Sequence, residues 1–114
     1  MEVKVVKQDE ARSFWEGPEL CREYFKTEKI TLGTSTLEPG ETGAIDWGHK
    51  ASHEIFFVIR GKVQMRTPHN DAKYALNEGD AIIMPETVPH EPTNIGDTTC
   101  VISWSLAPSE FPEG

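Results

Sequence analysis

Three of the four histidines and one glutamate lie beside the two most apolar segments of the sequence. His49, His53 and Glu54 come just before or at the start of one such segment, and His90 follows the other. Imidazole and carboxylate groups bind Fe, Mn, Zn, Ni and Cu ions. A metal ion needs ligands that converge on one point, and a barrel whose alternate residues point inward would bring these side chains together. The fourth histidine, His69, lies in a polar turn, and we expect it to be solvated.

The elements that must position these side chains are expected to be β-strands. Eight prolines and nine glycines interrupt the chain every few residues, which leaves little room for a helix. Between the turn residues, short runs that favour sheets recur at regular spacing, which is typical of an all-β sandwich or barrel. The expected strands are 19–32, 34–37, 44–47, 54–60, 62–67, 73–76, 81–84 and 98–106.

Alternation within these runs predicts which faces are buried. In the run 100–106 every second residue shares one face, namely Cys100, Ile102, Trp104 and Leu106. By contrast, the runs 55–59 and 81–84 are apolar on both faces. We therefore expect these two strands to be covered on both sides, by a barrel interior on one side and by a second sheet or a subunit interface on the other.

Composition and charge exclude several classes of protein. A chain of 114 residues is expected to form a single domain, residues 1–114. Its 37% hydrophobic and 26% charged residues are ordinary for a globular protein. With 19 acidic residues, 11 basic ones and a net charge of −8, the chain has no basic cluster for nucleic acid or an anionic membrane. We therefore expect neither of these as a partner.

The termini and the cysteines predict where the protein works. The first residues carry charges and no apolar signal segment, so we expect a cytoplasmic protein. The longest apolar run, 55–59, is far too short for a membrane helix. Cys21 and Cys100 share no short metal-binding spacing and are expected to be reduced core thiols.

The segment 79–94 resembles the second motif of the cupin superfamily. The motif has the pattern G-x5-P-x-G-x2-H-x3-N, and four of its fixed positions match, at Gly79, Pro85, His90 and Asn94. Thr87 stands where the pattern has its inner glycine. The resemblance extends over roughly residues 32–106. It implies a double-stranded β-helix, or jelly-roll barrel, preceded by N-terminal strands within 1–31 and followed by an extended tail, 107–114.

The first cupin motif, G-x5-H-x-H-x(3,4)-E-x6-G, is matched less completely. The match is good from Glu54 onward. Counted from Gly43, His49 takes the first histidine position and Ala51 stands at the second. Counted back from Glu54, His49 is the second histidine and Trp47 replaces the first. Either count leaves one histidine missing.

The resemblance implies one divalent transition metal, Fe, Mn, Ni or Zn, held by His49, Glu54 and His90. Water or substrate would complete the coordination shell. His53 is a further candidate ligand. If Glu54 points into the barrel, its neighbour on a regular strand points outward, so His53 would reach the metal only through a bulge or a turn.

The resemblance leaves two kinds of function open. The first is a small metal-dependent enzyme acting on a small molecule, with a dioxygenase-like role favoured over lyase, decarboxylase, isomerase or cyclase chemistry, all of which occur in the family. The second is a non-catalytic module that binds a sugar or a small acid, which the incomplete first motif favours. Trp47 and Trp104 are candidate walls of the ligand pocket, although a core or interface role would also explain them. Cupins commonly pair through their outer sheet, so a homodimer is expected.

Overall fold

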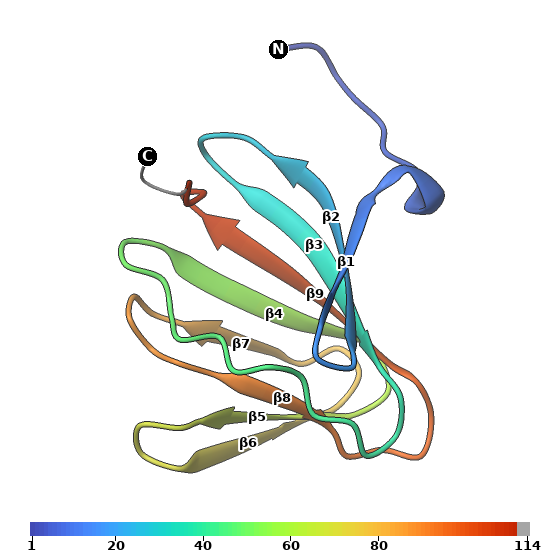
Figure 1. Cartoon of the computed structure of the whole chain (residues 1–114), viewed down its shortest axis with the longest axis vertical. Helices are drawn as coiled ribbons and strands as arrows, with labels where there is room; N and C mark the ends of the chain where they lie inside the picture. The colour runs from blue at the N-terminus through green and yellow to red at the C-terminus, as the bar shows by residue number, and fades with distance from the viewer. Residues whose placement is uncertain (112–114) are drawn as a thin grey trace.

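Two antiparallel β-sheets pack against each other in the computed structural model, which describes residues 1–111 (Figure 1). A short 3₁₀ turn, η1 (Gln8–Glu10), precedes the strands. The larger sheet has the order β1 (Arg12–Glu16), β2 (Glu19–Lys26), β3 (Thr31–Leu37), β9 (Cys100–Ala107), β4 (His53–Arg60) and β7 (Ala81–Met84). The smaller sheet has the order β6 (Ala72–Leu76), β5 (Val63–Thr67) and β8 (Glu91–Asn94). The predicted all-β, double-stranded β-helix fold is confirmed.

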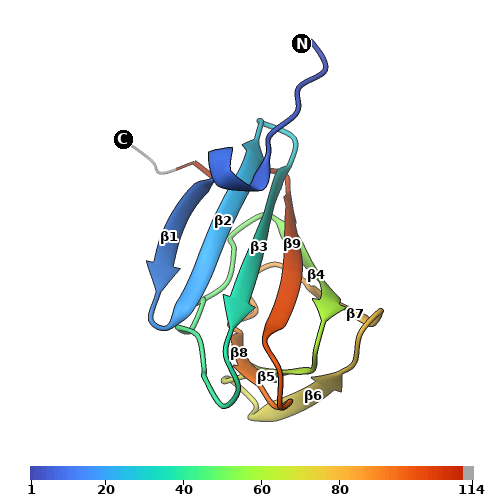
Figure 2. The same ribbon diagram turned by 90° about the vertical axis from the view of Figure 1, so that its right-hand side faces the viewer.

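The core lies between the two sheets and follows the alternation of the strands. Its buried side chains come from both sheets and comprise Phe56, Val58, Val63, Met65, Met84, Cys100 and Ile102. Trp104, on β9, packs against this cluster. Figure 2 shows β9 between β3 and β4 in the larger sheet. The predicted inward face of the last strand is therefore confirmed. Burial of such apolar side chains is the main stabilising contribution to a fold of this kind.

Several expected strand boundaries were wrong. The run 19–32 is two strands, β2 and β3, joined by a turn in which Thr27 N–H donates to the Ile30 carbonyl. The run 44–47 is no strand, because only an isolated bridge at Asp46 pairs it with its neighbour. The strand β1 lies within the N-terminal strands expected over 1–31. The strand β8 was not expected, since it contains a proline, Pro92, which argues against a strand from sequence.

The outer face of β4 and β7, which a second sheet or a subunit interface was expected to cover, is partly exposed in the single chain. Phe56 and Val58 point into the core, as expected. The outward side chains Ile55, Phe57 and Ile83 are 45%, 44% and 52% exposed in the single chain. Within residues 1–111 no second sheet covers this face, and the subunit interface stays a prediction.

The segment between β3 and β4, residues 38–52, runs antiparallel to the segment 87–94 beside β8 (Figure 1). Backbone N–H groups on both sides of this contact donate to carbonyls of the facing segment, among them Gly40 to Asn94 (3.0 Å), Gly43 to Pro92 (2.9 Å), Asp46 to His90 (2.9 Å) and Thr87 to His49 (2.7 Å). An irregular segment is thereby fixed in place, because its backbone groups are satisfied as in a sheet.

Cys21 and Cys100 are buried free thiols, in agreement with the prediction. Burial, followed by the charge of Glu19, raises the pKa of Cys21 to about 12 and that of Cys100 to about 11, so both are protonated and unreactive at neutral pH. Within residues 1–111, the structure contains no helix with the length and apolar character needed to cross a membrane. The expected extended tail, 107–114, lies partly outside the described residues.

Candidate metal centre

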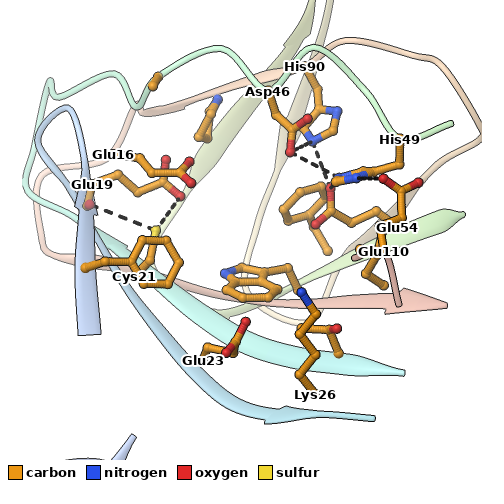
Figure 3. A pocket seen from close by; sticks show the side chains of 17 residues that line it. Glu16, Glu19, Cys21, Glu23, Lys26, Asp46, His49, Glu54, His90 and Glu110 are labelled. Carbon is orange, nitrogen blue, oxygen red and sulfur yellow. Dashed lines mark hydrogen bonds and ion pairs between the residues drawn. The ribbon is translucent and has the colours of Figure 1, made fainter. Parts of the chain in front are cut away.

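Four potential ligand atoms meet between the two sheets: Asp46 Oδ2, His49 Nε2, Glu54 Oε1 and His90 Nε2 (Figure 3). They all lie within 4.8 Å of one another. His49 Nε2 is 3.1 Å from Asp46 Oδ2 and 3.3 Å from Glu54 Oε1. His90 Nε2 is 2.9 Å from Glu54 Oε1 and 3.5 Å from Asp46 Oδ2. Each imidazole nitrogen thus faces both carboxylates.

Three parts of the chain bring these atoms together. Glu54 is the second residue of β4, and because side chains alternate along a strand, Glu54 points inward while His53 points outward. Asp46 and His49 lie on the segment 38–52, and His90 stands directly before β8. The Asp46 N–H donates to the His90 carbonyl, and the His90 N–H donates to the Asp46 carbonyl at 2.8 Å. This bridge places the two side chains next to each other.

The donor atoms lie close together without making hydrogen bonds with one another. His49 Nε2 and Glu54 Oε1 are buried and have no hydrogen-bond partner among residues 1–111. A buried polar atom without a partner is costly, and a metal ion at the common focus would satisfy both atoms. The imidazole and carboxylate donors present therefore fit a divalent transition metal.

Contacts behind the donor atoms fix their orientation. His90 Nδ1 donates to the Val88 carbonyl at 3.0 Å, which leaves Nε2 as the ligand nitrogen of the neutral ring. His49 Nδ1 lies 3.4 Å from Glu110 Oε2. Asp46 Oδ1 accepts the Gly48 N–H at 2.9 Å, so its other oxygen is free for the centre. Such outer contacts hold ligands in place before the ion binds.

The carboxylates and imidazoles of the centre shift the pKa values of Asp46, His49 and His90. The Asp46 carboxylate, followed by that of Glu54, raises the pKa of His49 to about 10. Burial lowers the pKa of His90, but Asp46 and Glu54 outweigh burial and raise it to about 10. Burial opposes ionisation of Asp46, but the two histidines and the Gly48 N–H outweigh it and hold the pKa of that carboxyl well below its usual range. In the absence of metal, protons occupy both imidazoles.

A cavity of about 260 Å³ adjoins the four donors and lies between them and strands β1 and β2. Phe14, Phe56 and Trp104 give it apolar walls. The Trp104 indole N–H donates to Ser35 Oγ at 3.1 Å. A Cβ on Gly33 would collide with the Trp104 ring, so this glycine makes room for the tryptophan. The cavity opens to solvent, and its volume suits a small molecule.

The structure brings three of the predicted ligands, His49, Glu54 and His90, into one group. His53 lies outside this group, where its Nε2 is 2.7 Å from Glu86 Oε1 on the surface. The sequence interpretation missed Asp46. The signal that could have identified it is its carboxylate, which stands beside the position where the first motif lacks a histidine.

The two predicted pocket tryptophans have different positions. Trp104 lines the cavity. Trp47 is 74% exposed and is not among the residues that line it. His69 is exposed in the turn between β5 and β6, as expected for a solvated residue.

Comparison with known proteins identifies the family and the fold. A family model described as a cupin domain matches residues 33–106. A search of curated proteins found no match. A conserved protein with a double-stranded β-helix domain from Klebsiella pneumoniae has a TM-score of 0.79 and 20% identity, over 94% of this chain and 91% of that one.

Two further solved structures have the same fold. A predicted oxalate decarboxylase from Thermotoga maritima has a TM-score of 0.77 and 17% identity, over 93% of this chain and 100% of that one. The polyketide cyclase RemF from Streptomyces resistomycificus has a TM-score of 0.76 and 15% identity, over 97% of this chain and 83% of that one. At these identities the similarity shows the fold and leaves the reaction open.

Proposed function

The chain belongs to the cupin domain family, and from this premise we propose that it is a metal-dependent enzyme that acts on a small molecule by dioxygenase-type chemistry. The observation that carries the proposal is the convergence of two imidazole nitrogens and two carboxylate oxygens beside a cavity with apolar walls. Two histidines with a carboxylate are the donor set of non-haem iron oxygenases, and this centre contains that set.

Asp46, His49, Glu54 and His90 would hold the ion. Four protein donors fill a tetrahedral shell, whereas a six-coordinate ion such as iron, manganese or nickel keeps open positions. A bound ion of this kind would supply Lewis acidity and, in the case of iron, reactivity towards dioxygen. The apolar walls of the cavity would exclude bulk water from the substrate.

The named relatives leave the reaction class open. One is a predicted oxalate decarboxylase and another a polyketide cyclase, so decarboxylase and cyclase reactions are the competing forms of the proposal, with lyase and isomerase reactions beside them. The donor set favours the oxygenase over these. A non-catalytic binding module would share the cavity but would need no open metal position.

Metal content is the first test of the proposal. Purified protein should contain or take up close to one equivalent of Fe²⁺, Mn²⁺ or Ni²⁺, measured by elemental analysis after dialysis. His49→Ala and His90→Ala should each lose the metal, because each removes one donor. His69→Ala, which changes an exposed histidine in a turn, is the matched control and should keep it. Wild-type protein that takes up none of these ions would end the proposal.

The oxygenase form has its own test. Protein loaded with Fe²⁺ without air is exposed to nitric oxide, which binds iron only where a position is open. An iron–nitrosyl signal in electron paramagnetic resonance is the expected result. Iron that binds at full occupancy but gives no such signal would exclude oxygenase chemistry and would favour the non-catalytic binding module.

We also propose that the outer face of β4 and β7 binds a second copy of this chain. Its side chains Ile55, Phe57, Ile59 and Ile83 are 44–52% exposed and adjacent in the sheet. Contiguous exposed apolar side chains of this kind are typical of an interface. Light scattering should give twice the mass of the chain, and Phe57→Glu should give the mass of one chain. Tyr74→Glu, which changes an equally exposed aromatic on β6, should not alter the mass.

A further inference from the structure

The cavity wall that faces the metal group is rich in carboxylates. Glu16 on β1 and Glu19 on β2 are paired in the strand register, and both line the cavity (Figure 3). Glu23 follows on the same face of β2. A bulge between Glu23 and Phe25 then shifts the alternation, so that Lys26 lines the cavity in place of its neighbour.

Two of these carboxylates have no counter-ion in the protein. Among residues 1–111, neither Glu16 nor Glu19 makes an ion pair with a lysine or an arginine. Glu23 does, because Arg12 Nε lies 3.2 Å from its carboxylate. Glu19 is only 7% exposed, so solvent screens its charge poorly.

Lys26 is the single ammonium group among the described residues that line the cavity. It is an exposed residue, and its Nζ lies 4.6 Å from the centroid of the Phe111 ring, which it approaches as a cation approaches an aromatic face. Its charge is therefore directed to the C-terminal segment. It leaves Glu16 and Glu19 without a counter-ion among residues 1–111, and Glu19 Oε2 accepts a hydrogen bond from Cys21 Sγ at 3.6 Å.

The carboxylates also repel each other. Burial, followed by the charges of Asp46 and Glu54, raises the pKa of Glu16. Burial is likewise the largest cause that raises the pKa of Glu19, and the charges of Glu16 and Glu54 add to it. A positive charge between these groups would offset the repulsion.

Two buried atoms of the metal group face this space and have room for a ligand beside them. Glu54 Oε1 and His49 Nε2 face the same cavity and are buried without hydrogen-bond partners in the described part of the chain. The metal group itself adds little positive charge, because Asp46 and Glu54 balance a divalent ion. An anionic substrate therefore gains little attraction from the centre and meets repulsion from the opposite wall.

We propose that the cavity selects a small cationic substrate, an amine or an amidine, whose charged group lies against Glu16 and Glu19 while its other end faces the metal group. This inference rests on the proposed metal-dependent function, since it assigns the substrate class of the same site. Apolar contacts from Phe14 and Trp104 would hold the carbon skeleton between the two ends.

The test uses ligands with one metal-binding head and three different tails. Protein loaded with Mn²⁺ is titrated by calorimetry with 6-aminohexanohydroxamate, with heptanohydroxamate and with adipic acid monohydroxamate, and then with shorter and longer members of each series. At the best chain length, the ammonium tail should bind at least about tenfold more tightly than the methyl tail, and the carboxylate tail more weakly than both.

Single substitutions then locate the preference. Glu16→Gln and Glu19→Gln should each reduce the advantage of the ammonium tail by about threefold or more. Neither should change the manganese content or the affinity for the methyl tail. Glu28→Gln, which changes an exposed glutamate in the turn after β2, is the matched control and should retain the full advantage.

The two proposals fail in different ways. Full manganese uptake with equal affinity for all three tails, or with a preference for the carboxylate tail, overturns the cationic substrate and leaves the metal site standing. Protein that takes up no manganese contradicts the metal-dependent function. Charge selection is then measured on the metal-free protein by NMR, where hexylamine but not hexanol should shift the amide signals of Glu16 and Glu19, and equal shifts would overturn it.

Discussion

Metal uptake at this centre should depend steeply on pH, because protons and the metal ion compete for the same imidazole nitrogens. In the metal-free protein, Asp46 and then Glu54 raise the pKa of His49 to about 10. Burial opposes the charge of His90, but the same two carboxylates raise its pKa to about 10 as well. Both rings are therefore protonated at neutral pH, and an ion can bind only when both have lost that proton.

The size of the effect follows from the number of protons released. Two imidazolium groups each lose one proton, so the affinity for Mn²⁺ should rise about a hundredfold per pH unit between about pH 7 and pH 9. Histidines with an ordinary pKa of about 6.5 are mostly neutral at pH 7, and the affinity would then change little over the same range. Asp46→Asn removes a carboxylate that raises both pKa values, so it should lower the slope as well as the affinity.

Competition against a chelator of known affinity measures the slope, once the chelator's own protonation is included. Calorimetry in two buffers of different ionisation enthalpy counts the released protons independently. His53→Gln removes a histidine that lies outside the centre and should leave both results unchanged. A wild-type slope equivalent to less than about one proton per ion would refute the reasoning, because the carboxylates would then not hold protons on the two rings.

Three further outcomes concern stability and can be measured by urea unfolding. The raised pKa values of His49 and His90 stabilise the metal-free fold, and this stabilisation is complete below about pH 6.5. It is lost as the pH rises through about 10, so the free energy of unfolding should fall between these two pH values. A free energy of unfolding that stays constant over this range would contradict the prediction. Thr87 is exposed and has φ of 66°, a backbone conformation that glycine adopts without strain. Thr87→Gly should therefore raise the free energy of unfolding by about 1 kcal/mol. A decrease would show that the Thr87 side chain stabilises the turn. The buried Asn94 amide donates to the carbonyls of Leu37 and Thr98, each at 2.9 Å. Asn94→Ala should therefore cost about 2–4 kcal/mol, against little change for the exposed Asn77→Ala.

The sequence predicted the fold because its local signals agree with one another. Turn residues separate short alternating runs, and the alternation in 100–106 correctly identified the buried face of β9. The strand β8 was missed because its four residues include Pro92, and a proline argues against a strand. In the structure Pro92 lies opposite Met65 in the register, and the neighbouring residues supply the pairing. Such compensation depends on the partner strand, which no local pattern contains.

The exposed face of β4 is a second feature that the sequence pattern alone could not predict. The run 55–59 is apolar throughout, and this pattern is the same whether a second sheet of the chain or another molecule covers the outer side. In the structure, β5, β6 and β8 pack against the inner side alone. The apolar run therefore identified an apolar face, and the packing of the smaller sheet on the inner side leaves the outer side exposed.

Asp46 shows why a motif can lose a residue while the site keeps a donor. The cupin pattern, counted back from Glu54, expects a histidine at position 47, where Trp47 points to solvent. One position earlier, Asp46 is bridged through its backbone to His90, and this pairing turns its carboxylate towards the centre. In an irregular segment, the direction of a side chain depends on hydrogen bonds to residues far along the chain and follows no periodic pattern, so the sequence could not reveal it. The exchange also has a chemical consequence for the proposed function: a carboxylate in place of an imidazole would balance the charge of a divalent ion, so that the glutamates on the opposite wall would select the charge of the substrate.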